Sequence, residues 1–336
     1  MPGRVTDPAI DTRWDERIAR ARQLANEYSP AADILTFYAA LAEYQKSLLD
    51  TSTGSIQPTS GPPEGGHYRS CEAKSASFFE ALDLEPVLGA IPEFVSWLQG
   101  TAPSPLIQAV SEMRKLDRVG WRSVVDAYLT QQGGDIDHTD APSGAPRVPT
   151  DHAITFVVEA VLQPFAEQLA IRIANPGSRM AFISARGAPP PLAAAPRLED
   201  SLVAAAAGAS RIPNPESRVW CPICGSLPVL GILREEGHGA KRTLLCALCL
   251  TEWEYLRVVC TRCGEQQFDA LPVYTADQFA HIRIEACDSC RSYLKTIDMT
   301  KNGLAVPLVD DLASVALDLW ARERGYVRLR SSLLGL

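Results

Sequence analysis

Eight of the nine cysteines in this chain of 336 residues lie between positions 221 and 290, and they form four pairs with two residues inside each pair. Two intervening residues allow a tight turn that points both sulfurs at one cation, with backbone N–H groups directed at the sulfurs. Two such turns, about twenty residues apart, supply the four sulfurs of a tetrahedral site. The pairs are Cys221 with Cys224, Cys246 with Cys249, Cys260 with Cys263, and Cys287 with Cys290.

The cysteine region is an internal repeat, since Gly225 and Gly264 follow the first and third pairs and no glycine follows the other two. Glycine suits that position because it adopts a positive φ without a Cβ clash. The intervals are similar too, with 21 residues between the first and second pairs and 23 between the third and fourth. The repeat therefore predicts sequential rather than interleaved pairing. Site one then consists of Cys221, Cys224, Cys246 and Cys249, and site two of Cys260, Cys263, Cys287 and Cys290.

Whether clustered cysteines bind metal or form disulfides depends on the cellular compartment. The N-terminal sequence has no apolar core of the kind a signal peptide needs, and no apolar run approaches the ~18 residues of a membrane span. We therefore expect a cytoplasmic protein without membrane insertion, in which reduced cysteines bind metal more often than they form disulfides. Four thiolates hold iron in the same geometry as zinc, so two metal ions of either kind are expected. Their default role is to stabilise two modules too small to hold a core alone.

The part of the chain before residue 210 shows helical periodicity. Residues 12–27 carry apolar side chains at spacings of four, three and four on a charged background, which is typical of an amphipathic helix. Residues 152–173 are apolar on most sides and are expected to form a central helix, and their interruption by Glu159 and Glu167 disfavours a membrane span. Further helices are expected at residues 31–49, 77–84, 93–98, 105–116, 119–131 and 201–209.

The hydrophobic period changes near residues 213–216. Short apolar or alternating runs at 229–233, 243–246, 251–255 and 281–286 predict β-hairpins, and residues 250–259 are expected to form one strand that joins the two modules rigidly. An apolar stripe over residues 309–324 predicts a last helix. We expect an α+β fold with a mainly α-helical domain at 1–214, rubredoxin-like (zinc-ribbon-like) four-cysteine modules at 215–257 and 258–300, and a C-terminal helix within 301–336.

Charge narrows the function classes. The chain has a formal net charge of −8, and residues 216–299 hold nine basic and eleven acidic side chains. Each four-thiolate site with a divalent metal adds about −2 more, whereas a nucleic-acid-binding zinc ribbon needs the opposite sign. Aromatic residues are plentiful around the cysteines, which favours a protein-binding surface. They are Trp220, Trp253, Tyr255, Phe268, Tyr274, Phe279 and Tyr293.

Other candidate residues are weaker. Cys71 follows His67 by four positions, but a lone cysteine is more often a buried apolar residue than a nucleophile. His138 and His152 are expected to be solvated, and neither His238 nor His281 has a cysteine at ligand spacing. The sequence has no GxGxxG, P-loop, GxSxG or HExxH motif, so we expect no catalytic residues.

The runs CPICGSLP, RTLLCALCLTEWEYLRVVCTRCGE, EACDSCRSYLK and VDDLASVALDLWARERGY together resemble the formate dehydrogenase accessory (formation) protein family in order and spacing, over residues 220–326. The resemblance implies a cytoplasmic, non-catalytic factor with a helical N-terminal domain and two rubredoxin-like modules. Such factors are needed to make active respiratory formate dehydrogenase, and they contact its catalytic subunit before export. The resemblance also implies that the eight paired cysteines bind iron or zinc.

Two other function classes stay open at this point. One is a rubredoxin-like iron electron carrier, and the other, disfavoured by charge, is a zinc-ribbon protein that binds nucleic acid. The sequence also leaves a homodimer open.

Overall fold

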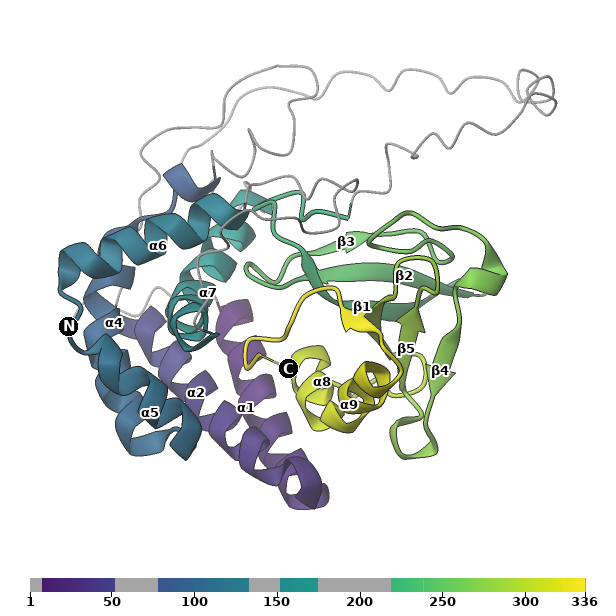
Figure 1. Ribbon diagram of the computed structural model, residues 1–336, viewed down its shortest axis with the longest axis horizontal. Coiled ribbons are helices and arrows are strands. Elements are labelled where there is room, and N and C mark those ends of the chain that lie inside the picture. Colours follow the sequence, from purple (N-terminus) through teal and green to yellow (C-terminus); the bar gives the residue numbers. More distant parts are fainter. Residues whose placement is uncertain (1–7, 52–77, 133–151, 175–218, 238, 336) are drawn as a thin grey trace, which may run out of the picture.

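The structure, a computed structural model, describes residues 8–51, 78–132, 152–174, 219–237 and 239–335. A group of helices lies on one side of the molecule, and a β-sheet with two later helices lies on the other (Figure 1). The predicted α+β class is thereby confirmed. The predicted helix at 201–209 and the predicted boundary at 213–216 fall outside the described residues, and the limits of the four predicted segments stay a prediction.

The helical part follows the sequence periodicity closely. The predicted helix at 93–98 is the middle of a longer one, which starts where the Asp83 side chain accepts a hydrogen bond from the Glu85 N–H at 3.0 Å and continues through Pro92. The helices are α1 (Pro8–Glu27), α2 (Ala32–Thr51, after a 3-10 turn at Ser29–Ala31), α4 (Leu84–Thr101), α5 (Ser104–Met113), α6 (Arg118–Gln132) and α7 (His152–Ala174).

Helix α7 is the centre of this part and contacts α2, α4, α5 and α6. It is long and apolar enough to cross a membrane, but 83% of its most apolar window is buried inside the protein. Two of the polar side chains that interrupt its sequence have partners from other segments: both Glu167 oxygens accept from Arg17 of α1 at 2.6 and 3.0 Å, and Gln163 donates to the carbonyl of Ala247, the residue after β2. These contacts explain why α7 is apolar on most sides and yet carries carboxylates and amides.

The second part is built on one seven-stranded sheet in the order β3-β2-β1-β6-β5-β4, with β7 paired to β6. Each cysteine module contributes an antiparallel hairpin, and the two hairpins are joined by parallel pairing of β1 with β6, in which Gly231 is opposite Thr296. The two modules are therefore halves of one sheet. The strands are β1 (Pro228–Glu236), β2 (Gly239–Cys246), β3 (Glu252–Glu254), β4 (Val273–Thr275), β5 (Ile282–Ala286), β6 (Ser292–Asp298) and β7 (Val327–Arg328).

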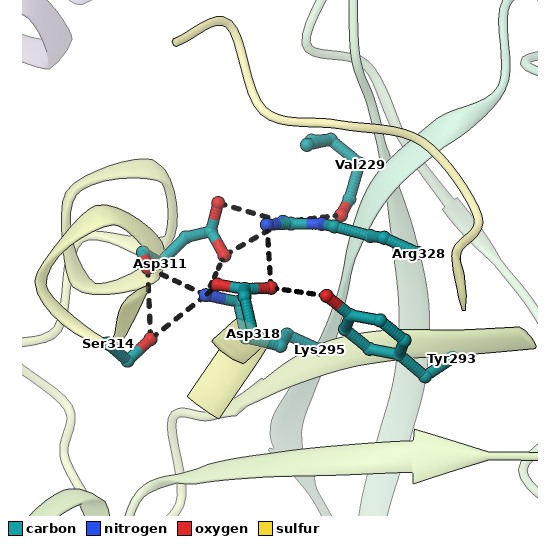
Figure 2. Close-up of polar contacts among 7 residues, drawn as sticks. All are labelled: Val229, Tyr293, Lys295, Asp311, Ser314, Asp318 and Arg328. Atoms are coloured by element: carbon teal, nitrogen blue, oxygen red, sulfur yellow. Dashed lines mark hydrogen bonds and ion pairs between the residues drawn. The ribbon is translucent and has the colours of Figure 1, made fainter. Parts of the chain in front are cut away.

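Two short helices, α8 (Pro307–Ala313) and α9 (Val315–Glu323), pack on one face of this sheet (Figure 1). The contact contains a buried charge network (Figure 2). Lys295 of β6 is fully buried, and its ammonium lies 2.6 Å from carboxylate oxygens of both Asp311 and Asp318. Arg328 pairs with the same two carboxylates at 2.8 and 3.1 Å, so two positive and two negative side chains balance inside the protein.

The prediction of one continuous helix at 309–324 is wrong, and the network explains why the helix is interrupted. The helix breaks at Ser314, whose ψ is 30°, between α8 and α9. The Lys295 ammonium and the Ser314 hydroxyl both donate to the backbone carbonyl of Asp311, at 2.8 and 2.9 Å. This carbonyl would otherwise accept the next helical hydrogen bond.

The strand predicted over residues 250–259 is also wrong, because β3 spans only Glu252–Glu254. Beyond it, the Tyr255 N–H donates to the Arg242 carbonyl at 3.1 Å and the Tyr255 ring packs into a small core with Leu244 and Leu294. Strands β4, β6 and β7 were not predicted. The sequence pattern does not predict β6, because Lys295 and Asp298 occupy buried positions where an apolar residue is expected.

Candidate metal centres

All four cysteine pairs form the same turn. In each, the N–H of the first cysteine donates to the carbonyl five residues later at 2.8–3.0 Å, as from Cys221 to Ser226 and from Cys260 to Glu265. The residue after the second cysteine has a positive φ in every case. It is 76° at Gly225, 73° at Gly264, and 55° at both Leu250 and Arg291.

A positive φ was predicted only at Gly225 and Gly264, but Leu250 and Arg291, which follow the glycine-free pairs, adopt it too. A non-glycine residue in this region costs about 1–2 kcal/mol, so the rest of the turn must hold it there. The repeat was the signal that could have revealed this, because equivalent positions in the four pairs need equivalent backbone conformations.

The turns gather the eight cysteines in the predicted sequential groups, and within each group the sulfurs lie within 4.8 Å of one another. At site one the sulfurs of Cys221 and Cys249 are 3.5 Å apart and those of Cys224 and Cys246 are 3.4 Å apart. At site two the separations are 3.7 Å between Cys260 and Cys290 and 3.6 Å between Cys263 and Cys287.

These separations fit a bound metal. A tetrahedral ion with metal–sulfur bonds of about 2.3 Å places its sulfurs ~3.8 Å apart, close to the distances at both sites. Disulfides are excluded among these eight residues, since each is a free cysteine. Both clusters can therefore hold a zinc or iron ion.

Backbone N–H groups and nearby hydroxyls can stabilise negative charge on the sulfurs. The N–H groups of Leu248 and Cys249 lie 3.4 Å from the Cys246 sulfur, and that of Arg262 lies 3.3 Å from the Cys260 sulfur. Hydroxyls lie beside two further sulfurs, with Thr251 3.2 Å from Cys249 and Ser292 3.0 Å from Cys290. Such contacts spread thiolate charge and orient the ligands.

Both sites contain thiols that resist ionisation. At site one, burial raises the pKa of the Cys246 and Cys249 thiols well above the ordinary value of 9.0. At site two, the hydrogen bond with Cys290 and then burial raise the pKa of the Cys260 thiol above that value, while hydrogen bonds from Cys260 and then from Ser292 lower the pKa of Cys290 to about 4. A metal ion at either site must therefore displace protons from buried thiols, and this couples metal binding to pH.

Site one lies inside the molecule. Its four cysteines are buried and belong to the same apolar cluster as the core of the helical part, together with Leu248. Gln163 of α7 donates to the Ala247 carbonyl, inside the second turn of this site, at 3.1 Å. Close to this contact, Arg330 pairs with Glu159 of α7, which also accepts from Tyr128 of α6 at 2.9 Å. Site one is thus part of the contact between the sheet and the helices.

Site two lies at the surface. Cys260 and Cys287 are buried, but Cys263 is exposed and Cys290 is half-buried. One edge of this cluster therefore faces solvent. The two sites share one sequence pattern, and the difference in exposure between them comes from packing of site one against helices that are distant in the sequence.

Among the remaining candidate residues, the two that the structure describes lie outside both clusters. His281 lies 2.9 Å from Asp310, which also pairs with Arg20 of α1, and His152 is exposed at the start of α7. Cys71, His67, His138 and His238 fall outside the described residues.

Most of the aromatic residues expected on a binding surface have structural roles instead. Tyr255, Phe279 and Tyr293 are buried, and Trp220, Trp253 and Tyr274 are half-buried. Phe268, in a 3-10 turn at Phe268–Ala270, is the exposed one of the seven.

Three family models match successive parts of the chain. "FdhE, N-terminal" matches residues 2–142, "FdhE, central domain" matches residues 220–257, and "FdhE, C-terminal domain" matches residues 258–334. Site one lies wholly within the second match and site two within the third.

Curated relatives match about a third of the chain. The chain is 42% identical over 118 residues to the Protein FdhE homolog of Aquifex aeolicus, covering 34% of this chain and 41% of that protein. It is 40% identical over 120 residues to the homolog of Haemophilus influenzae (35% and 39% covered) and 38% identical over 122 residues to Protein FdhE of Escherichia coli O127:H6 (36% and 39%). The matches thus span about two fifths of the length of these relatives.

A solved structure extends the likeness to the whole fold. The crystal structure of the FdhE protein from Pseudomonas aeruginosa aligns with 96% of this chain and 95% of its own chain, with a TM-score of 0.60 and 25% identity. The helical part and the sheet part are therefore both shared with that protein.

Proposed function

This chain belongs to the FdhE family, and on that premise we propose that it is an accessory protein for the formation of formate dehydrogenase. In this role it binds the catalytic subunit of the enzyme in the cytoplasm, before export, and carries out no chemistry on a substrate. The observation that carries the proposal is the ordered match of the three FdhE models, which includes both cysteine clusters.

The eight clustered cysteines are proposed to hold two metal ions, one at each site. The sulfur separations of 3.4–3.7 Å support this assignment. A bound ion neutralises thiolates that would otherwise repel, and it closes each pair of turns into one rigid unit, so metal binding supplies folding free energy. Metal analysis of protein purified without oxygen tests the assignment, with two ions per chain expected. Cys224→Ser should lose one ion and disorder the first module; a folded variant with two ions would refute the ligand assignment.

Binding of the catalytic subunit is tested by co-purification. A tagged full-length chain should retain the catalytic subunit of formate dehydrogenase from cells grown under conditions in which that enzyme is made. The matched genetic test is deletion, which should abolish formate dehydrogenase activity without lowering the mRNA of the catalytic subunit. Normal activity in the deletion strain would refute the proposal.

A second function, electron transfer through rubredoxin-like iron, is favoured by one observation. Cys263 is exposed and Cys290 is half-buried, so an iron ion at site two would lie within electron-transfer reach of a partner. This function predicts a coloured protein with reversible one-electron reduction. A colourless zinc protein without a redox wave would exclude it.

A further inference from the structure

Exposed apolar side chains gather beside site two. Phe268 is 79% exposed, Val273 of β4 is 54% exposed, and Val258, in the segment that joins the two modules, is 49% exposed. All three line one shallow groove together with the site-two ligands Cys260 and Cys287. Exposure of a phenylalanine and two valines to water is unfavourable in free energy. Exposed apolar patches of this kind mark surfaces that another molecule covers.

The groove is too small for a metabolite. Its volume is about 90 Å³, the space of about three water molecules, whereas small-molecule sites enclose roughly 300–1,000 Å³. A space of this size suits one apolar side chain of a protein partner, as in the central pocket of a protein–protein contact. The occupant is therefore a polypeptide that anchors an apolar residue here.

The charges at the groove indicate the sign of the charge that a partner should carry. Arg283 and Arg242 share the carboxylate of Glu285, which leaves that group with a positive excess. Arg257 lines the groove and Arg262 follows the lining residue Thr261; both are exposed, and in the described part of the chain no carboxylate pairs with either. The thiolates of site two with a divalent metal would carry a charge of about −2, which the arginines of the groove lining, Arg242, Arg257 and Arg283, offset. A partner thus meets arginines that lack an anion.

A second copy of this chain does not fit the groove. In a symmetric dimer the same patch contacts itself, which would bring Arg257 and Arg262 close to their own copies. A partner with carboxylates beside its apolar residue satisfies both the arginines and Phe268.

We propose that the groove formed by Val258, Phe268 and Val273 and rimmed by Arg257 and Arg262 is the docking surface for a segment of the formate dehydrogenase catalytic subunit that carries an apolar residue flanked by acidic ones. This assignment rests on the proposed function. It also gives site two a role, because its ligands Cys260 and Cys287 line the groove and a bound metal would hold that wall in place beneath the partner.

The test measures the affinity of the full, metal-loaded chain for the purified catalytic subunit by biolayer interferometry. Phe268→Asp removes the apolar anchor, and Leu304→Asp is its matched control, since Leu304 is 84% exposed in the loop before α8 and does not line the groove. Arg257→Glu with Arg262→Glu reverses the rim charge, and Arg322→Glu on the exposed side of α9 is the control. Because these side chains are exposed, metal content and circular dichroism should be unchanged.

We expect Phe268→Asp and the double arginine variant each to weaken binding at least tenfold, and the two controls to stay within twofold of wild type. Wild-type affinity in both groove variants would overturn the docking surface while leaving the proposed function intact. Absence of binding by the wild-type chain itself would overturn the proposed function and this assignment with it. A wild-type dimer that Phe268→Asp converts to a monomer would also overturn it, in favour of a second copy.

Discussion

The buried charge network gives the sharpest test of how the sheet and the last helices hold together. Lys295→Met keeps the length of the side chain and removes its charge. Two buried carboxylates, Asp311 and Asp318, then share the single remaining cation, Arg328. The Asp318 oxygen that accepted from Lys295 at 2.6 Å loses this donor.

The expected cost follows from the uncompensated charge. Removing one partner of a buried ion pair costs ~3–5 kcal/mol, mainly because the other charge stays buried. This loss is a large part of the free energy of unfolding of a typical domain, which is ~5–15 kcal/mol. A second substitution, Asp318→Asn, restores charge balance. It keeps the oxygen that accepts from Tyr293 at 2.8 Å and from Arg328 at 3.1 Å. The double variant should therefore recover ~2 kcal/mol relative to the sum of the single substitutions.

Urea unfolding of the metal-loaded protein, followed by circular dichroism and tryptophan fluorescence, measures both quantities. The matched control is Lys241→Met, because Lys241 also contacts two carboxylates, Glu236 and Glu254, but on the surface. It should change stability little, since solvent screens exposed pairs. Equal losses for Lys295→Met and Lys241→Met, or a double variant whose loss equals or exceeds the sum of the two single losses, would refute the reasoning.

Three further predictions concern the seam between the modules, the metal sites and pH. A Cβ atom at Gly231 of β1 would lie 2.3 Å from the Thr296 hydroxyl, so Gly231→Ala should cost ~1–3 kcal/mol by overpacking. Adding Thr296→Ala should restore at least half, as the unfolding midpoint will show; no rescue would contradict the assigned contact. A colorimetric chelator should remove the site-two metal at least tenfold faster than the site-one metal, because Cys263 is exposed while all four site-one cysteines are buried. Cys263→Ser and Cys224→Ser assign the two phases, and a single phase would disprove the difference. Burial alone would raise the pKa of Asp311, but Arg328 and Lys295 hold it below the ordinary value of 3.8. Its stabilising contribution is therefore complete above that value and disappears as pH falls through the lower folded pKa. Wild type and Asp311→Asn should thus differ in urea midpoint at neutral pH, and the difference should shrink as pH falls below 3.8; a constant difference would count against this assignment.

Local features of the molecule were predictable from the sequence. The apolar spacing in residues 12–27 and 152–173 predicted α1 and α7, because one buried face repeats every turn of a helix. The spacing of cysteines predicted the four turns and their grouping, because the ligand geometry is set within a few residues.

Features that depend on distant segments were not predictable in this way. The parallel pairing of β1 with β6 joins residues about sixty positions apart, and nothing in either strand specifies the other. The break at Ser314 depends on Lys295 from another element. The burial of site one depends on α7, so two clusters with the same sequence pattern differ in exposure. In each case the deciding partner is supplied by the tertiary fold.

The joined sheet also sets an order of events during synthesis. The ribosome delivers residues 228–236 of β1 well before residues 292–298 of β6 and before Arg328, which donates toward the Val229 carbonyl of β1. Both turns of site one are thus complete while one side of β1 still lacks its neighbour, and contacts between distant segments form late. Nascent chains therefore pass through a stage in which the first pair of turns is complete and could take up a metal ion before β6 joins β1.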